Sequence, residues 1–257
     1  DGSLNVVSDV ILDKRLFVTS DVSFNSKLFV NDDVSMNSAL FVGKNTIIDG
    51  SLNVASDVIL DKRLFVTSDV SFNSKLFVTD DVSMNSALFV GKNTRIDGSL
   101  NVVSDVILDE RLFVTSDVSF NSKLFVNDDV SMNSALFVGK NTRIDGSLNV
   151  VSDVLLDKRL FVTSDVSFNS KLFVTDDVSM ISALFVGKNA RIDGSLNVVS
   201  DVLLDKRLFV TSDVSFNSKL FVTDDVSMNS ALFVGKNTRV DGSLNVVSDV
   251  ILDKRLF

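Results

Sequence analysis

The sequence lacks six residue types, and their absence excludes several classes of function. It contains no His, Cys, Trp, Tyr, Pro or Gln. Without His and Cys there are no thiol nucleophiles, Ser–His pairs, zinc fingers or iron–sulfur ligand sets. The lack of Cys also excludes disulfides, so cysteine usage does not indicate a redox compartment. No run of 18 or more apolar residues occurs, so we predict no membrane-spanning helix.

Acidic residues outnumber basic ones in this chain of 257 residues. There are 34 Asp and Glu against 25 Lys and Arg, Glu110 is the only glutamate, and the net charge is -9. Nucleic acids bind basic surfaces, so this balance opposes a nucleic-acid partner. Paired carboxylates suit glycoside hydrolysis, but every such pair recurs along the chain, whereas active sites are not normally repeated. We therefore predict that the chain is not an enzyme, binds no cofactor and has no metal site.

The sequence repeats at two levels. The hexapeptide that begins at Asp1, Asp-Gly-Ser-Leu-Asn-Val, returns with a constant period at Asp49, Asp97, Asp145, Asp193 and Asp241. Each 48-residue block divides into four 12-residue units, the first four being DGSLNVVSDVIL, DKRLFVTSDVSF, NSKLFVNDDVSM and NSALFVGKNTII. Nothing interrupts the pattern, so residues 1–257 are predicted to be a single repeat array. Both ends fall within the pattern, and we expect the chain to have been cut from a longer array.

Each 12-residue unit is predicted to form two short strands. Apolar residues stand two apart, as in Leu4 and Val6 and again in Val10 and Leu12, which places both on one face of a strand. The three residues before each pair are mostly Asp, Asn, Ser, Gly or Lys, which are typical of turns. The apolar spacing does not follow a 3.6-residue stripe, so a helix is excluded. The pattern predicts an all-β fold, a β-solenoid or β-helical fibre in which strand and turn alternate every six residues.

Differences between copies indicate which side chains face inward. One column reads Ile47, Arg95, Arg143, Arg191 and Arg239, and a position that accepts both Ile and Arg points to solvent. The next column reads Ile48, Ile96, Ile144, Ile192 and Val240, which is typical of a core position. The comparison supports the alternation of inward and outward residues.

Phenylalanine occupies the middle of many strands, where alternation places it outside. A single solenoid would then carry a long stripe of exposed Phe, larger than the patches that are usual on soluble monomers. One interpretation is that some rings lie flat over neighbouring coils; the other is that this face is buried against another copy. We favour the second, as a homotrimer that also covers strand edges. The predicted oligomer interface comprises Phe17, Phe29, Phe41, Phe65, Phe77, Phe89, Phe113, Phe125 and Phe137.

The sequence leaves three lengths for one coil of the solenoid: 12, 18 or 24 residues. Twelve keeps every column aligned, but it stacks Asp9 on Asp21 about 4.8 Å apart, which is repulsive. Eighteen instead sets Asp9 beside Lys27 and Arg15 beside Asp33, but it crowds six large apolar residues into a small triangle. Twenty-four allows a wider core.

The turns carry motifs that have both a structural and a functional interpretation. Asp9, Asp21, Asp32 and Asp33 supply oxygen atoms of the kind that Ca²⁺ prefers. Each Asp is instead expected to accept backbone N–H groups in its own turn, and the glycine-rich nonapeptide of calcium-binding β-rolls is absent. The segment 43–45, Gly-Lys-Asn, lacks the spacing of a phosphate-binding loop. No regular outward Thr column suggests ice binding.

Two phrases resemble the repeats of fibre-like proteins from large algal DNA viruses. They are residues 20–30, SDVSFNSKLFV, and residues 33–42, DVSMNSALFV. The chain is similar more broadly to trimeric viral fibre shafts, although it lacks the Gly/Pro turn of the adenovirus-type β-spiral. The resemblance implies a virion-surface or extracellular fibre that holds a host-binding tip away from its base.

We therefore predict a structural shaft that acts as a rigid spacer. Its expected partner is itself, as a homotrimer, with no nucleic acid and no membrane insertion, and a host receptor would be reached through terminal domains outside this sequence. The alternatives are a cell-surface adhesin with repeated binding turns and a self-assembling β filament.

Overall fold

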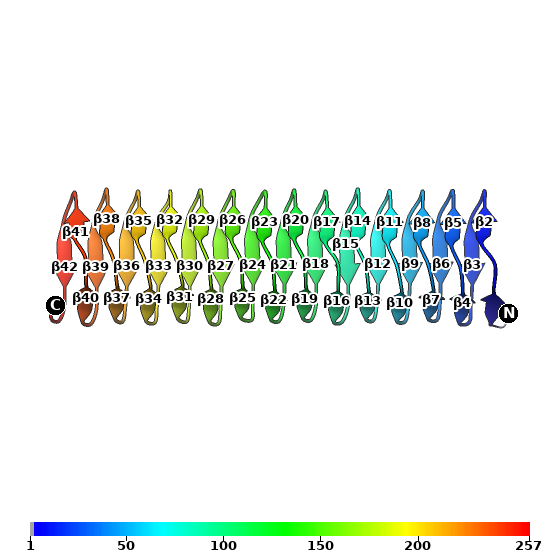
Figure 1. Cartoon of the computed structure of the whole chain (residues 1–257), viewed down its shortest axis with the longest axis horizontal. Coiled ribbons are helices and arrows are strands. Elements are labelled where there is room, and N and C mark those ends of the chain that lie inside the picture. The colour runs from blue at the N-terminus through cyan, green and yellow to red at the C-terminus, as the bar shows by residue number, and fades with distance from the viewer. Residues whose placement is uncertain (1–2) are drawn as a thin grey trace. The chain divides into compact units, whose positions relative to one another are not determined.

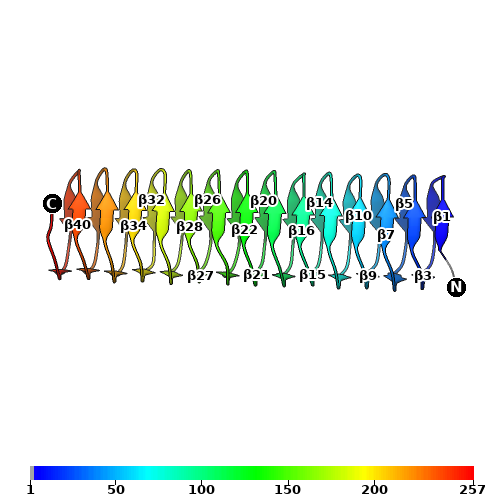
Figure 2. The same ribbon diagram turned by 90° about the horizontal axis from the view of Figure 1, so that it is seen from below.

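The computed structural model describes residues 3–257, and these residues form strands and turns with no helix. The chain divides into two compact units, residues 1–128 and residues 129–257. Each unit is a three-sided parallel β-solenoid in which every strand is three residues long and each sheet has seven strands. Neighbouring strands of one sheet lie side by side along each unit (Figure 1), and the view turned by 90° shows the same stacking (Figure 2). The predicted all-β solenoid is confirmed.

The first unit contains strands β1 to β21, which the coil assigns to the three sheets in rotation. Sheet A comprises β1 (Leu4–Val6), β4 (Val22–Phe24), β7 (Leu40–Val42), β10 (Val58–Leu60), β13 (Leu76–Val78), β16 (Thr94–Ile96) and β19 (Leu112–Val114). Sheet B comprises β2 (Val10–Leu12), β5 (Leu28–Val30), β8 (Thr46–Ile48), β11 (Leu64–Val66), β14 (Val82–Met84), β17 (Leu100–Val102) and β20 (Val118–Phe120). Sheet C comprises β3 (Leu16–Val18), β6 (Val34–Met36), β9 (Leu52–Val54), β12 (Val70–Phe72), β15 (Leu88–Val90), β18 (Val106–Leu108) and β21 (Leu124–Val126).

The second unit repeats this arrangement with strands β22 to β42. Its strands in sheet A are β22 (Val130–Met132), β25 (Leu148–Val150), β28 (Val166–Phe168), β31 (Leu184–Val186), β34 (Val202–Leu204), β37 (Leu220–Val222) and β40 (Thr238–Val240). Those in sheet B are β23 (Leu136–Val138), β26 (Val154–Leu156), β29 (Leu172–Val174), β32 (Ala190–Ile192), β35 (Leu208–Val210), β38 (Val226–Met228) and β41 (Leu244–Val246). Those in sheet C are β24 (Thr142–Ile144), β27 (Leu160–Val162), β30 (Val178–Met180), β33 (Leu196–Val198), β36 (Val214–Phe216), β39 (Leu232–Val234) and β42 (Val250–Leu252).

The structure adopts the 18-residue coil, and so decides between the three coil lengths that the sequence left open. The register pairs Leu4 with Val22 and Leu76 with Thr94. Three strands complete a coil, and each coil advances about 4.8 Å, the usual strand separation. Because this coil equals one and a half 12-residue units, the first strand of a unit always lies beside a second strand of another unit.

The core is built from the first and third residues of each strand. In β13, Leu76 and Val78 are 1% and 0% exposed, whereas Phe77 between them is half-buried on the outer face. The predicted inward and outward alternation is confirmed, including the inward column that contains Ile96 and the outward column that contains Arg95.

Large and small side chains alternate between coils, which is why six inward residues fit in each triangle. Leu76 lies beside the smaller Val58 in the strand below, and at the other end of the same strands Val78 lies beside the larger Leu60. Each strand therefore pairs one larger side chain with one smaller one, and its neighbour reverses their order. The expected overcrowding of an 18-residue coil does not occur, because alternation of this kind lets adjacent layers interdigitate.

One core position in each 48-residue block is usually occupied by a polar residue. Thr46, Thr94, Thr142 and Thr238 are fully buried, and within the described residues their hydroxyl oxygens have no hydrogen-bond partner. Ala190 takes the equivalent place in β32. Because Ala serves at this position, the hydroxyl is not needed for the fold.

Candidate functional site

The nine phenylalanines predicted to form an oligomer interface lie on all three sheets. Sheets A, B and C each contain three of them, eight in the first unit and Phe137 in the second. Phe17 is 64% exposed, Phe41 38% and Phe65 37%, and the other six are half-buried. The structure therefore does not gather them into one stripe, and that expectation was wrong. Whether they form an interface stays a prediction.

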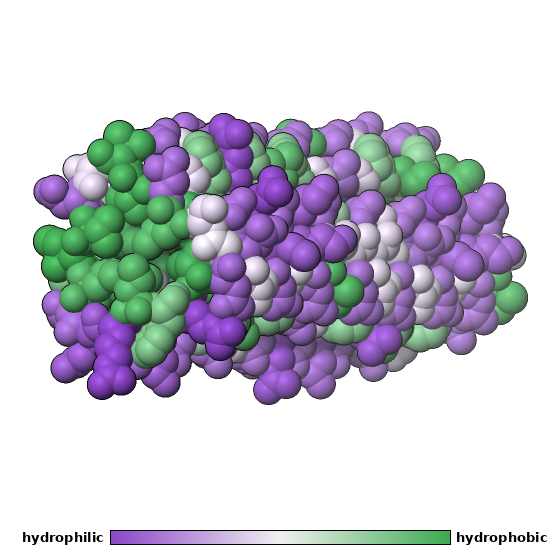
Figure 3. Space-filling view, turned by 60° about the vertical axis from the view of Figure 1, so that its left-hand side comes forward, coloured by the Kyte–Doolittle hydropathy of each residue, from purple (hydrophilic) through white to green (hydrophobic). Residues whose placement is uncertain are grey.

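The 18-residue coil explains why the Phe stripe is interrupted. The middle residue of a first strand, Phe or Asn, lies beside the middle residue of a second strand, which is Ser, Ile, Leu or Arg. Phe89, for example, lies between Ser71 and Ile107. In Figure 3, apolar and polar side chains are interspersed over the visible face, and a larger apolar cluster appears at the C-terminal coil, where Leu256 and Phe257 are exposed.

Apolar outer residues nevertheless gather in groups of five consecutive coils, which we call aromatic ladders. Each ladder has the order Phe, aliphatic residue, Phe, Arg, Phe. The ladder on sheet A of the first unit consists of Phe41, Ile59, Phe77, Arg95 and Phe113. The ladder on sheet B of the second unit consists of Phe137, Leu155, Phe173, Arg191 and Phe209.

Each ladder contains an arginine held between two aromatic rings. The Arg95 guanidinium carbon lies 5.6 Å from the centre of the Phe77 ring and 5.2 Å from that of Phe113. The Asp97 carboxylate accepts a hydrogen bond from Arg95 Nε at 2.9 Å. Cation–π attraction and the carboxylate together fix the guanidinium flat against the ladder. The sequence indicated that this arginine faces outward, but it gave no signal of the aromatic partners, because they lie one full coil away on either side.

The second unit repeats this geometry. Arg191 lies 5.5 Å from the Phe173 ring centre and 5.2 Å from that of Phe209, and its Nε donates to Asp193 at 2.9 Å. In the first 48-residue block Ile47 stands in place of the arginine, so the outer residues around it are apolar and do not form a ladder of this order. The aromatic ladder is therefore an element that recurs with the 48-residue block.

The turns are joined by aspartates that clamp the next coil. Asp57 accepts a hydrogen bond from Ser74 Oγ at 2.5 Å and another from the Lys75 amide at 3.2 Å. Further along the same column Asn93 accepts the Arg111 amide at 3.3 Å. Along a corner of the solenoid, a turn whose third residue accepts hydrogen bonds is therefore followed by a turn whose third residue donates its amide. The accepting turns precede the second strand of each 12-residue unit, and the donating turns precede the first strand.

The clamp lowers the pKa of its aspartate. For Asp57 the hydroxyl of Ser74 is the main cause and the Lys75 amide the next, since both stabilise the charged carboxylate, whereas desolvation opposes them. The pKa is also lowered, with a serine hydroxyl again the first cause, in Asp9, Asp21, Asp153, Asp165, Asp201 and Asp213. The expectation that Asp9 and Asp21 accept backbone N–H groups in their own turns was wrong, because they accept the Lys27 and Ala39 amides one coil away. Asp32 does accept the Asp33 amide within its own turn.

Opposite charges lie beside each other in adjacent coils, as predicted for an 18-residue coil. Asp9 bonds the Lys27 amide and is stabilised by the Lys27 charge. Arg15 Nε lies 3.9 Å from an oxygen of Asp33 and 3.7 Å from one of Asp32. Both predicted pairs are therefore present, and the repulsion between stacked aspartates that a 12-residue coil would cause is avoided.

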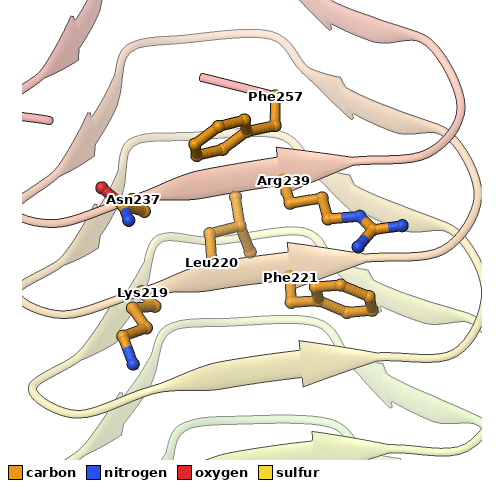
Figure 4. Close-up of a pocket in the computed structure, with 6 residues that line it drawn as sticks. All are labelled: Lys219, Leu220, Phe221, Asn237, Arg239 and Phe257. Carbon is orange, nitrogen blue, oxygen red and sulfur yellow. The ribbon is translucent and has the colours of Figure 1, made fainter. Parts of the chain in front are cut away.

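A pocket of about 570 Å³ lies beside sheet A of the second unit, where Phe185, Leu203, Phe221 and Arg239 repeat the ladder order. Figure 4 shows the Arg239 side chain running alongside Phe221, with Phe257 on the chain end that follows the last strand. The Arg239 guanidinium lies 5.0 Å from the Phe221 ring centre. The pocket is lined by Lys219, Leu220, Phe221, Asn237, Arg239 and Phe257. Because the same residue types recur at Lys171, Phe173, Arg191 and Phe209, this place is one copy of a repeated surface.

Nothing in the described part of the chain singles out a metal centre or a membrane span. Among residues 3–257, acidic side chains do not gather in groups of three or more that would hold a metal ion. The same residues include no helix of the length and hydrophobicity needed to cross a bilayer. No protein-family model, curated protein or solved structure matches the chain.

Proposed function

We propose that this chain is the structural shaft of an extracellular or virion-surface fibre and acts as a rigid spacer. The observation that carries the proposal is that, within residues 3–257, the outward Arg and Phe side chains of the repeat are distributed over all three sheets. In the second unit Arg143 lies on sheet C, Arg191 on sheet B and Arg239 on sheet A. A protein with a single binding or catalytic site would be expected to gather its functional side chains in one place. A spacer requires only that its coils stack uniformly.

The continuous hydrogen bonding of the coils supports stiffness. Parallel strands pair at every coil within each unit, and buried apolar layers fill the interior. Each unit of seven coils extends about 34 Å along its own axis at the usual strand separation. The resemblance of residues 20–42 to fibre-like repeats of large algal DNA viruses supports the virion-surface setting. We propose copies of the same chain as its main partner, in a homo-oligomer that uses the outer phenylalanines, and no catalytic role.

Lengthened chains test the shaft. One 48-residue block supplies eight strands, so each added block lengthens the particle by about 13 Å. Small-angle X-ray scattering of the native chain and of chains with one and two extra blocks measures this increment, and the cross-sectional radius should stay constant. A particle that thickens or folds back on itself as blocks are added would overturn the proposal.

The second candidate function is a cell-surface adhesin with repeated binding elements. It is favoured by the recurrence of the ladder of Phe, Arg and Asp side chains on exposed faces. An adhesin of this kind binds its target surface with an affinity that rises with the number of blocks even when the chain carries no terminal domain. A spacer does not bind, so a pull-down of the repeat array with host cells distinguishes the two.

A further inference from the structure

We propose that the aromatic ladders are lateral contact surfaces on which a second copy of this chain docks in parallel. This inference rests on the proposed shaft, because it assumes that solenoids stand beside one another. Its starting point is the exposed apolar surface of the ladder on sheet A of the first unit, where Phe41 is 38% and Ile59 39% exposed. The turns at the two ends of the ladder strands indicate what covers this surface.

Opposite charges border the three central strands of the ladder. Strand β10 has Asp57 in the turn before it and Asp61, Lys62 and Arg63, which together are net positive, in the turn after it. Strand β13 has Lys75 before it and Asp80 with Asp81 after it. Strand β16 has Lys92 before it and Asp97 after it. The sign on each edge reverses between β10 and β13.

The ladder on sheet B of the second unit has the same border. Asp153 precedes β26, and the net positive turn of Asp157, Lys158 and Arg159 follows it. Lys171 precedes β29, and Asp176 with Asp177 follows it. The charge pattern thus accompanies the ladder wherever the repeat places it. A ladder and its border form one recurring surface.

This border is complementary to itself when two copies lie parallel. A two-fold axis along the solenoid brings the leading turn of each strand opposite the trailing turn of the same strand in the second copy. Asp57 then faces Lys62 and Arg63, Lys75 faces Asp80 and Asp81, and Lys92 faces Asp97, on both sides of the contact. Antiparallel copies centred on β13 would instead set Lys75 against Lys75, so in the register that superposes the central strands electrostatic complementarity favours the parallel arrangement.

The central arginine fits the same arrangement. Arg95 is drawn toward Asp97 in the trailing turn. The two-fold axis places the trailing turns of the two copies on opposite sides, so the two guanidinium groups lean away from each other. The rings of Phe77 and its copy are left to meet at the centre, where burial of aromatic side chains contributes most to an interface.

The size of the surface predicts a weak individual contact. Five coils of about 4.8 Å and a side about 20 Å wide give about 500 Å² on each copy. The total of about 1,000 Å² is at the lower limit for a specific interface. Because ladders recur on more than one face of the second unit, a chain can hold several neighbours, and the association strengthens with the number of ladders. The geometry therefore favours an open bundle over a closed trimer.

Charge reversal on the full chain tests the proposal. A first variant changes Lys75, Lys123, Lys171 and Lys219 to Asp, and a second changes Asp80, Asp128, Asp176 and Asp224 to Lys. Sedimentation velocity over a concentration series should show reversible association of the native chain that weakens with salt. Each variant alone should associate at least tenfold more weakly, because the first sets negative charges opposite each other and the second cancels the negative charge that faces Lys75. An equimolar mixture of the two should regain the association.

The second variant separates specific docking from general charge repulsion. Its net charge is reduced from -9 to about -1, so repulsion between chains falls and non-specific association would increase. Stronger association of this variant than of the native chain would overturn the proposal, as would a mixture no stronger than its components. Circular dichroism must show that both variants retain the native β spectrum, and otherwise single reversals at Lys75 and Asp80 replace them.

A native chain that stays monomeric at all concentrations would also overturn the inference. Scattering from that monomer still decides the proposed function, because a chain that lengthens by about 13 Å per block remains a shaft. Binding of a soluble β-glucan oligosaccharide by the monomer, measured by titration calorimetry, would assign the ladders to a glycan instead of to a second copy.

Discussion

The Ser74 hydroxyl donates a hydrogen bond of 2.5 Å to Asp57, which lies one coil below. The Lys75 amide bonds the same carboxylate oxygen. Contacts of this kind join turns whose strands already pair, so each corner of the solenoid is held by side chains as well as by the ladder of backbone hydrogen bonds.

Acid should weaken the fold through these clamps. The folded pKa of Asp57 lies below its ordinary value of 3.8, so the clamp contributes its full stability above the unfolded pKa and loses it as the pH falls through the folded pKa. We expect a melting temperature that is nearly constant from pH 7 to about pH 5 and that falls below about pH 4. Thermal denaturation followed by circular dichroism measures it.

Removing the serine donors should reduce this acid response. The variant Ser74→Ala, Ser170→Ala, Ser218→Ala should melt at a lower temperature at pH 7 and lose less on acidification. The matched control changes three outward serines in mid-strand, Ser83, Ser179 and Ser227, to Ala and should keep the native profile. Equal acid responses in the clamp variant and the native chain would contradict the role given to the clamps.

Replacing a buried threonine by valine should stabilise the chain. The Thr94 hydroxyl is buried with no partner among the described residues, and valine fills the same volume without an unsatisfied polar group. We expect the free energy of unfolding in urea to rise by about 1 kcal/mol. The control Thr94→Ser keeps the hydroxyl and removes the methyl group, so it should lose about 1 kcal/mol. A loss of stability in Thr94→Val would show that the hydroxyl has a partner.

Glycine at position 98 should not tolerate a side chain. A Cβ there would lie 2.5 Å from the Asp80 carbonyl carbon and 2.6 Å from the Asp81 carboxylate, which bonds the Ser99 amide. Gly98→Ala must displace that turn, and we expect a loss of about 1–3 kcal/mol in urea unfolding. Lys62→Ala, at the same position of another turn, should be nearly neutral. Equal stability of both variants would mean that the turn below yields freely.

The alternation of first and second strands should make the chain sensitive to a half-unit deletion. Deleting residues 103–108 sets Leu88 beside Leu112 and places Asn93 beside Asp117, so large residues meet and an acceptor faces a carboxylate. Deleting residues 103–114 removes a whole unit and restores the alternation. We expect the shorter deletion to melt at least about 5 °C below the longer one. The opposite order would show that the alternation contributes little.

The strands were predictable from the sequence, but the coil was not. Leu4 and Val6, two residues apart after a polar triplet, locate a strand by local pattern alone, and the same pattern recurs throughout. The choice of an 18-residue coil depends on partners in the neighbouring coil, such as Leu76 beside Val58 and Asp57 beside Ser74. Alignment of the repeated columns favoured a 12-residue coil and the repulsion between Asp9 and Asp21 opposed it, whereas the pairing of strands 18 residues apart decides the coil length.

The ladders were missed for a related reason. Sequence reasoning placed Phe77 and Arg95 outside, but it treated each as a member of its own column. Their contact follows only once the coil length is known. The opposite charges on either side of β13 were also missed. They lie in turns six residues apart in the sequence, which stand at opposite ends of one strand.

The mismatch between block and coil also sets a direction. Eight strands complete two coils and two sides of a third, so inserting one block rotates everything that follows by about two thirds of a turn. Two chains that differ by one block would aim the same downstream group to different sides, and three blocks restore the original heading. Where a group attached to the chain must point to a fixed side of the solenoid, the array can be lengthened or shortened only by three blocks at a time.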